Sequence, residues 1–192
     1  MQPLKFQRST KTHVAAVESE SFRVAMRRLP GGVSIITSGQ GSDRSGMTAT
    51  SLSSLSVDPP SLIVSINRDA SIRPILDRYK AFGASVLRAG QKSVADRFAG
   101  IGGLKGNGRF IGERWIALET GAPLLATALA VFDCEVEDII DRHTHSIIIG
   151  LSRPYRYRLK APRWFTGRGN TPHPALESLK STTIGKGRER AP

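Results

Sequence analysis

Cysteine is nearly absent from the sequence, which has only Cys134 among its 192 residues. A single thiol cannot form an intramolecular disulfide, and there is no Cys-x-x-Cys pair for dithiol redox chemistry or a zinc ribbon. In the alternating stretch 130–137, Cys134 shares the apolar side with Phe132, while Asp133 and Glu135 are expected to face solvent. We therefore interpret Cys134 as a core residue rather than a reactive thiol.

Long apolar runs are also missing. No stretch reaches the roughly 18 consecutive apolar residues that a membrane-spanning helix requires, and residues 1–20 lack the apolar segment of a signal peptide. We therefore expect a cytoplasmic protein with no membrane partner. The sequence contains neither a Gly-x-Ser-x-Gly nucleophile motif nor the glycine-rich motif of a phosphate-binding loop, which argues against those two kinds of active site.

Acidic residues are few, with 16 Asp and Glu against 28 Lys and Arg, a net charge of +12. Residues 151–192 hold ten basic and two acidic residues, so they carry +8 of this total. Their polar, Pro- and Gly-rich end is typical of a solvated tail, so nucleic-acid binding is not expected, although an arm that binds polyanions stays open. We divide the chain into a flexible lead-in (1–18), one domain (19–169) and a basic, disordered tail (170–192).

Strand patterns outnumber helix patterns in the domain. Apolar or β-branched runs predict strands over residues 33–38, 47–56, 62–67, 82–87, 129–141, 145–150 and 163–167, with a turn over 39–46. Short helices are expected over 19–29, 70–79 and 91–100, the first capped by Ser19 or Ser21. Because strict alternation of strand and helix is missing, we predict a mainly β fold, a closed or partly closed antiparallel barrel with peripheral helices.

Two further features suggest sites but carry little weight. The glycine-rich segment 100–110 does not fit a dinucleotide-binding motif, and we interpret it as a flexible flap. His143 and His145 would lie on one face of a strand and could start a metal site, but no third ligand is evident. Without a nucleophile, a metal or a dithiol, we expect any chemistry to belong to a bound organic cofactor.

Five blocks of the sequence resemble the flavin reductase-like family, the reductase components of two-component flavin-dependent monooxygenases. The blocks, which occur in the same order and with similar spacing, are FRVAMRRLPGGVSIITS, GMTATSLSSLSVDPPSLIVSINRDASIRPIL, FGASVLRAGQKSVADRFAG, TGAPLLATALAVFDCEVEDIIDRHTHSIIIG and RWFTG. The resemblance implies a split antiparallel β-barrel of the FMN-binding type that forms a homodimer. It also implies hydride transfer from NADH or NADPH to FMN or FAD, with the reduced flavin passing to a partner monooxygenase.

The same resemblance implies a set of site residues. The segments that contact flavin in the family fall on Met47, Thr48, Ala49, Thr50, Ser51, Ser65, Asn67, Arg68 and Ser71. Ser71 is also expected to cap the following helix and to help hold the flavin phosphate. Further flavin positions are Ser85, Gln91, Phe98 and Phe165, and His145 matches a histidine linked with nicotinamide binding, which makes it the catalytic candidate.

Hydroxyl and amide groups suit a flavin because they bind its polar edge without burying a charge. Each assignment has an ordinary alternative: the hydroxyls of 47–51 can simply fill one side of a strand, and Arg68 and His145 can be solvated surface residues. Two other functions stay open. One is an FMN-binding enzyme of the same fold that retains its flavin for another redox reaction. The other is a non-enzymatic basic flavoprotein or binding module.

Overall fold

The computed structural model describes residues 17–153, and strands dominate this part of the chain. The strands are β1 (Ser34–Gln40), β2 (Asp43–Ala49), β3 (Ser53–Val57), β4 (Pro60–Asn67), β5 (Ala81–Val86), β6 (Trp115–Ala117), β7 (Pro123–Leu125), β8 (Ala130–Arg142) and β9 (His145–Ser152). The helices are α1 (Ser19–Met26), α2 (Arg73–Tyr79), α3 (Lys92–Phe98) and the 3-10 helix η1 (Gly106–Phe110).

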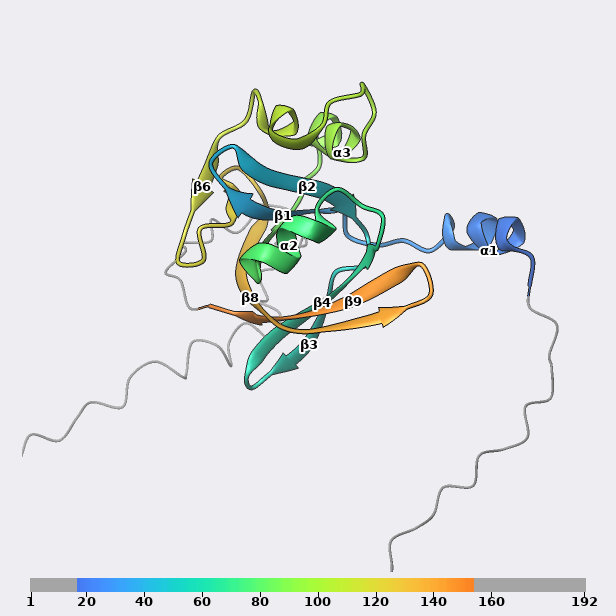
Figure 1. The fold of residues 1–192 in the computed structure, drawn as a ribbon. Helices are drawn as coiled ribbons and strands as arrows, with labels where there is room; N and C mark the ends of the chain where they lie inside the picture. The colour runs from blue at the N-terminus through green and yellow to red at the C-terminus, as the bar shows by residue number, and fades with distance from the viewer. Residues whose placement is uncertain (1–16, 154–192) are drawn as a thin grey trace, which may run out of the picture.

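Seven of these strands form one antiparallel sheet in the order β2-β1-β5-β8-β9-β4-β3, and β6 pairs with β7 in a small second sheet. The large sheet curves so that β1 and β2 lie across from β4 and β9, with α2 between the two pairs (Figure 1). The predicted mainly β fold, an antiparallel and partly closed barrel with peripheral helices, is confirmed.

Two hydrophobic cores lie on opposite sides of β1. Ile36 belongs to the first core, to which α2 contributes Ile72 and Leu76. Ile35 belongs to the second core, where Phe98 of α3 packs edge-on against Phe110. Because side chains alternate across a strand, two consecutive isoleucines serve both cores.

The alternating stretch in β8 is interpreted correctly at Cys134 and wrongly at Asp133. Cys134 is fully buried in the first core, where desolvation and the neighbouring Asp133 carboxylate raise the pKa of its thiol to about 12. Asp133 does not face solvent but is 1% exposed. Its carboxylate accepts hydrogen bonds from the Thr120 N–H, at 2.9 Å, and from the Thr120 hydroxyl. The turn before β7, which the sequence pattern missed, covers this part of β8.

The region between β1 and β4 also differs in detail from its prediction. The turn after β1 is shorter than the expected 39–46, because β2 already begins at Asp43, which pairs with Gln40. The single strand expected over 47–56 is divided into β2 and β3. Gly46 allows the close approach of α3 here, since a Cβ atom on it would lie 2.7 Å from the Phe98 ring.

The end of the glycine-rich segment 100–110 packs against the barrel rather than forming a free flap. Arg109 Nη1 donates a hydrogen bond to the Gly46 carbonyl of β2 at 2.7 Å. Phe110, at the end of the segment, is 3% exposed, and its ring packs against Trp115 with centroids 4.9 Å apart. We therefore correct the interpretation of residues 106–110: they cover part of the second core.

Helix α1 forms where the sequence predicts it and stands apart from the barrel (Figure 1). Its N-cap residue is Glu18, and no side chain caps it, so the expected role of Ser19 or Ser21 is wrong. Its apolar side chains are uncovered: Phe22 is 59% exposed, and Leu29, just after the helix, is 66% exposed.

Some expectations fall outside the described residues. These are the lead-in over 1–18 as far as residue 16, the strand over 163–167, which includes Phe165, and the tail over 170–192. Among the helices of residues 17–153, none has the length and apolar character needed to cross a membrane.

Candidate functional site

A side-chain hydroxyl in the link between β2 and β3 is hydrogen-bonded to the backbone of β4. Ser51 Oγ donates a hydrogen bond to the Ser65 carbonyl at 2.9 Å and accepts one from the Ser65 N–H at 3.2 Å. We call residues 50–52 and 65–67 the seam. Its polar side chains are hydroxyls and an amide, so it carries no formal charge.

The first predicted flavin segment sends its side chains in different directions. Met47 packs against the first core and Ala49 is buried in it. Thr48 turns towards α3, where its Oγ1 donates to the Ala95 carbonyl at 2.6 Å. Thr50 is exposed, and its hydroxyl has no hydrogen-bond partner among the described residues. Of the three hydroxyls in this segment, that of Thr50 is the one with no partner among the described residues.

Asn67 ends β4 and shapes the loop that follows. Its Oδ1 accepts a hydrogen bond from the Asp69 N–H at 2.9 Å, which is an Asx-turn and leaves the side-chain NH2 free to donate. Further along the loop, the hydroxyls of Ser71 and Ser45 are 3.1 Å apart. The expected cap at Ser71 is wrong, because Ile72 is the N-cap residue of α2 and no side chain caps that helix.

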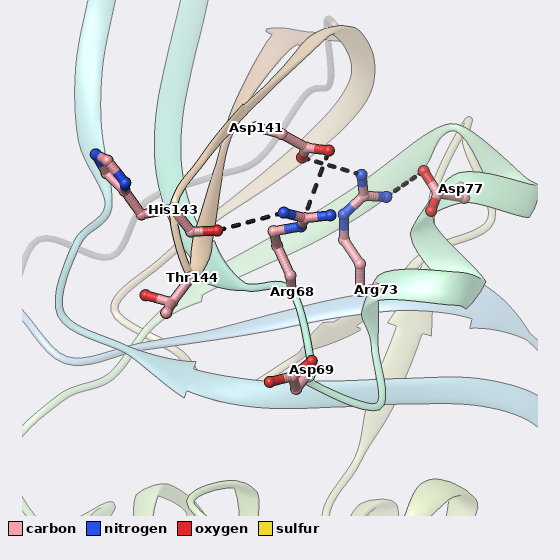
Figure 2. A pocket seen from close by; sticks show the side chains of 7 residues that line it. All are labelled: Arg68, Asp69, Arg73, Asp77, Asp141, His143 and Thr144. Atoms are coloured by element: carbon pink, nitrogen blue, oxygen red, sulfur yellow. Dashed lines mark hydrogen bonds and ion pairs between the residues drawn. The ribbon is translucent and has the colours of Figure 1, made fainter.

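His145 opens β9 directly opposite Asn67 in the β4–β9 ladder. Its Nδ1 lies 2.9 Å from Thr144 Oγ1, and its side chain is exposed. His143 does not share a strand face with it. His143 lies in the turn between β8 and β9 with φ of 50°, and its imidazole points away from the neighbouring ion pairs (Figure 2). Within residues 17–153, no three side chains gather in a way that could hold a metal ion.

Four of the predicted site residues therefore come together at the seam. Ser65 and Asn67 lie on the same face of β4 because they are two residues apart. Ser51 contacts the backbone of Ser65, and His145 lies opposite Asn67. This arrangement sets uncharged donors and acceptors beside one imidazole.

A cavity of about 430 Å³ adjoins the loop after β4 (Figure 2). It is lined by Arg68, Asp69, Arg73, Asp77, Asp141, His143 and Thr144. The Arg68 N–H donates to the Thr144 carbonyl at 3.0 Å, and its Nη1 donates to the His143 carbonyl at 3.3 Å. Arg68 is thus attached to the hairpin that precedes His145, rather than being a freely solvated side chain.

Both arginines in this cavity are paired with carboxylates. A hydrogen bond from the Ser146 hydroxyl, together with Arg68 and Arg73, holds the pKa of Asp141 below its ordinary value. The pKa of Arg73 is raised, chiefly by its hydrogen bond with Asp77. Because each guanidinium has a carboxylate partner, the cavity does not present an uncompensated positive charge.

A second cavity, of about 350 Å³, lies at the start of α3 and shares no lining residue with the first. It is lined by Val33, Leu87, Arg88, Ala89, Gly90, Gln91, Lys92 and Ala95. The side chain of Gln91 is engaged in the scaffold: its Oε1 accepts from the Arg88 N–H at 2.9 Å, and its Nε2 donates to Thr127 Oγ1 at 3.0 Å.

Two predicted flavin residues lie in the protein interior. Ser85 is fully buried, and its Oγ accepts a hydrogen bond from the Leu125 N–H at 3.0 Å. Phe98 is 1% exposed and packs against Phe110 and Trp115. Both side chains serve the scaffold, and their positions do not support the expected contact with a flavin.

The sequence patterns do not mark Arg73 and its partners as site residues. The spacing of Arg73 and Asp77 at i and i+4 on a helix is a local signal for an ion pair, and the two are paired. Asp141 and Ser146 carry no such signal, because they meet Arg73 only through the packing of the hairpin against α2.

Comparisons with known proteins point to one family. Residues 26–163 match the model of the flavin reductase like domain. The chain is 39% identical over 137 residues to an FMN reductase (NADH), RutF 2, of Methylorubrum extorquens strain PA1, which covers 70% of this chain and 77% of that protein.

Two solved structures are similar in fold and in sequence. BorF, the flavin reductase component of a bacterial two-component tryptophan halogenase, has a TM-score of 0.66 and 34% identity, covering 73% of this chain and 89% of its own. The NADH:FAD oxidoreductase SgcE6 of Streptomyces globisporus C-1027 has a TM-score of 0.63 and 33% identity, covering 75% of this chain and 88% of its own.

Proposed function

The chain belongs to the flavin reductase-like family, and from this premise we propose that it oxidises NADH and reduces a flavin, which then leaves for a partner monooxygenase. FMN is the flavin we favour, since RutF 2 is an FMN reductase (NADH). FAD is the alternative, since SgcE6 is an NADH:FAD oxidoreductase. The domain boundaries at 19–169 and the cytoplasmic location stay predictions from the sequence.

The seam is the observation that supports this proposal. The free hydroxyl of Thr50 and the free side-chain NH2 of Asn67 are uncharged groups of the kind that a flavin's polar edge requires. The two hydrogen bonds between Ser51 Oγ and the Ser65 backbone hold together the two segments on which Thr50 and Asn67 lie. The residues present therefore fit a flavin without burying an unpaired charge.

A bound flavin would supply the redox chemistry by accepting a hydride from NADH, which becomes NAD⁺. The chain then has to bind and orient the two reactants, because hydride transfer needs alignment more than it needs a protein acid or base. His145 is exposed opposite Asn67, so its imidazole can contact the nicotinamide side of such a complex. We assign His145 that orienting role.

The uncharged hydrogen-bonding groups of the site also favour release of the reduced flavin. Arg68 is engaged by the His143 carbonyl and lies 3.9 Å from Asp141, so it would bind a phosphate only by giving up part of these contacts. A site built from neutral hydrogen bonds and an engaged arginine favours moderate affinity. BorF offers a parallel, since it is one component of a two-component system.

The test is an assay of the purified protein with NADH or NADPH and with FMN, FAD or riboflavin. We expect loss of NADH absorbance with FMN, and separation of protein from flavin on gel filtration. No oxidation with any pair of dinucleotide and flavin would contradict the proposal. A yellow protein that keeps its flavin through the column would favour the alternative function, a flavoenzyme acting on another substrate.

We also propose that the protein forms a homodimer in which α1 contacts the second copy. Helix α1 has no buried residue in the described chain, and Met26 on it is 46% exposed. Apolar side chains grouped in this way are typical of an interface. Replacing Phe22 and Leu29 with serine should shift the protein to monomer in light scattering, whereas a dimer unaffected by both changes would place the interface elsewhere.

A further inference from the structure

Arg73 links α2 to the hairpin formed by β8 and β9. Its Nε donates a hydrogen bond to Ser146 Oγ at 3.3 Å, and its Nη2 lies 3.5 Å from Asp141 Oδ1. Ser146 Oγ in turn donates to Asp141 Oδ1 at 2.6 Å. Since Asp141 and Ser146 face each other across the hairpin, Arg73 holds both of its strands at once.

A second arginine holds the tip of the same hairpin. The backbone N–H of Arg68 donates to the Thr144 carbonyl, and its guanidinium donates to the His143 carbonyl. Figure 2 shows both guanidinium groups directed towards Asp141, from the loop after β4 and from α2. The loop that follows Asn67 and the hairpin that leads into His145 are therefore fastened together.

We propose that Arg73 is a positioning residue that sets the place of His145 relative to Asn67 and so aligns the dinucleotide with the flavin. This inference rests on the proposed function. His145 follows the tip held by Arg68 and precedes Ser146, which Arg73 contacts directly. The residue assigned to the nicotinamide thus lies between two anchored points of the chain.

Arg73 suits this task better than Arg68 because it is less accessible to water. The side chain of Arg73 is 14% exposed, whereas that of Arg68 is 52% exposed. The Arg73 guanidinium also contacts two elements, since it pairs with Asp77 on its own helix and with Asp141 on the hairpin. A planar fork with several donors can do this, whereas the point charge of a lysine cannot.

The test compares Arg73→Gln with Arg78→Gln, a matched control on the same helix. Arg78 also pairs with an aspartate, Asp43, but it is 64% exposed and lies away from the hairpin. We expect Arg73→Gln to raise the KM for NADH about tenfold, with a smaller change in the flavin Kd, because a small misplacement of a reactant is costly. Arg78→Gln should change neither, and Arg73→Lys should fall between Arg73→Gln and the wild type.

A double-mutant cycle separates positioning from a general loss of structure. If Arg73 acts through His145, Arg73→Gln in a His145→Ala background should change the KM for NADH by less than about twofold, because coupled changes are not additive. Multiplicative effects of the two changes would overturn the inference, as would an unchanged KM in Arg73→Gln. If Arg73→Gln does not fold, Asp141→Asn and Arg73→Lys replace it in the cycle.

A readout that does not require activity keeps this inference distinct from the proposed function. The imidazole signals of His145 in proton–nitrogen NMR spectra should shift or broaden in Arg73→Gln and stay unchanged in Arg78→Gln. If the wild-type protein oxidises no NADH with any flavin, the proposed function fails, and the spectra still decide whether Arg73 positions His145. Unchanged His145 signals in Arg73→Gln would overturn the positioning role.

Discussion

The hydroxyl of Ser51 forms both an accepted and a donated hydrogen bond with the backbone of Ser65, and this pair of bonds joins the link between β2 and β3 to β4. Ser51 therefore stabilises the fold in addition to any contact that it makes with a flavin. One acceptor position of its oxygen stays free for a ligand. The effects of changing Ser51 should include a loss of stability as well as of affinity.

Ser51→Ala should lower the free energy of unfolding by about 1 kcal/mol, since it removes two hydrogen bonds at an exposed site. Denaturant unfolding measures this change. Ser53→Ala is the matched control, because Ser53 Oγ contacts only the carbonyl of the next residue, at 3.3 Å. Equal midpoints for the wild type and Ser51→Ala would show that the seam contributes nothing to stability.

Thr50→Ala and Thr48→Ala should have opposite consequences. The hydroxyl of Thr50 has no partner in residues 17–153, so its loss should raise the FMN Kd about fivefold, the equivalent of one hydrogen bond, with little change in stability. The hydroxyl of Thr48 bonds to Ala95 of α3, so its loss should lower stability and leave the FMN Kd nearly unchanged. Flavin fluorescence titration and thermal melting check the two effects, and the reverse pattern would place the ligand on the α3 side of β2.

Gly46→Ala should destabilise the fold by about 1–3 kcal/mol, because overpacking forces neighbours to move. The new Cβ atom would lie 2.7 Å from the Phe98 ring and 2.8 Å from the Ile36 carbonyl. Gly32→Ala is the control, since nothing lies within 4 Å of the position of its Cβ. Unfolding midpoints measure both variants, and equal values would mean that Phe98 can shift without cost.

Asp141 should make an acid-sensitive contribution to stability. Its pKa in the folded protein is lowered from 3.8, so the charged form is favoured by folding. The contribution is complete above 3.8 and is lost as the pH falls through the folded pKa. Asp141→Asn should melt below the wild type at neutral pH, and the difference should narrow in acid. A difference in melting temperature that is constant with pH would contradict this.

The sequence predicts the scaffold better than the site, and β8 shows why. Its alternation correctly places Cys134 in a core, because a strand with one apolar face has to bury that face. The same pattern fails at Asp133, because a later turn supplies Thr120 as a partner and covers the carboxylate. Alternation describes one strand, whereas burial of the opposite face depends on segments distant in the chain.

The sequence also predicts the positions of some site residues better than those of others. The pairing of Asn67 with His145 follows from two strands that the sequence predicts and the structure confirms. Ser85 shows the limit, because the resemblance marks its position but not the direction of its side chain, which the packing of β7 turns inward. The role of Arg73 depends on Asp141, which is 68 residues away (141 − 73), so no local pattern reveals it.

Strand β1 has one further consequence for the behaviour of the whole domain. Ile35 and Ile36 belong to different cores. Detachment of β1 would therefore expose both cores at once. Partial unfolding that separates the α2 side from the α3 side is therefore disfavoured, and the barrel should unfold in one cooperative step. The amide hydrogens of β1 should then be among the last to exchange with water.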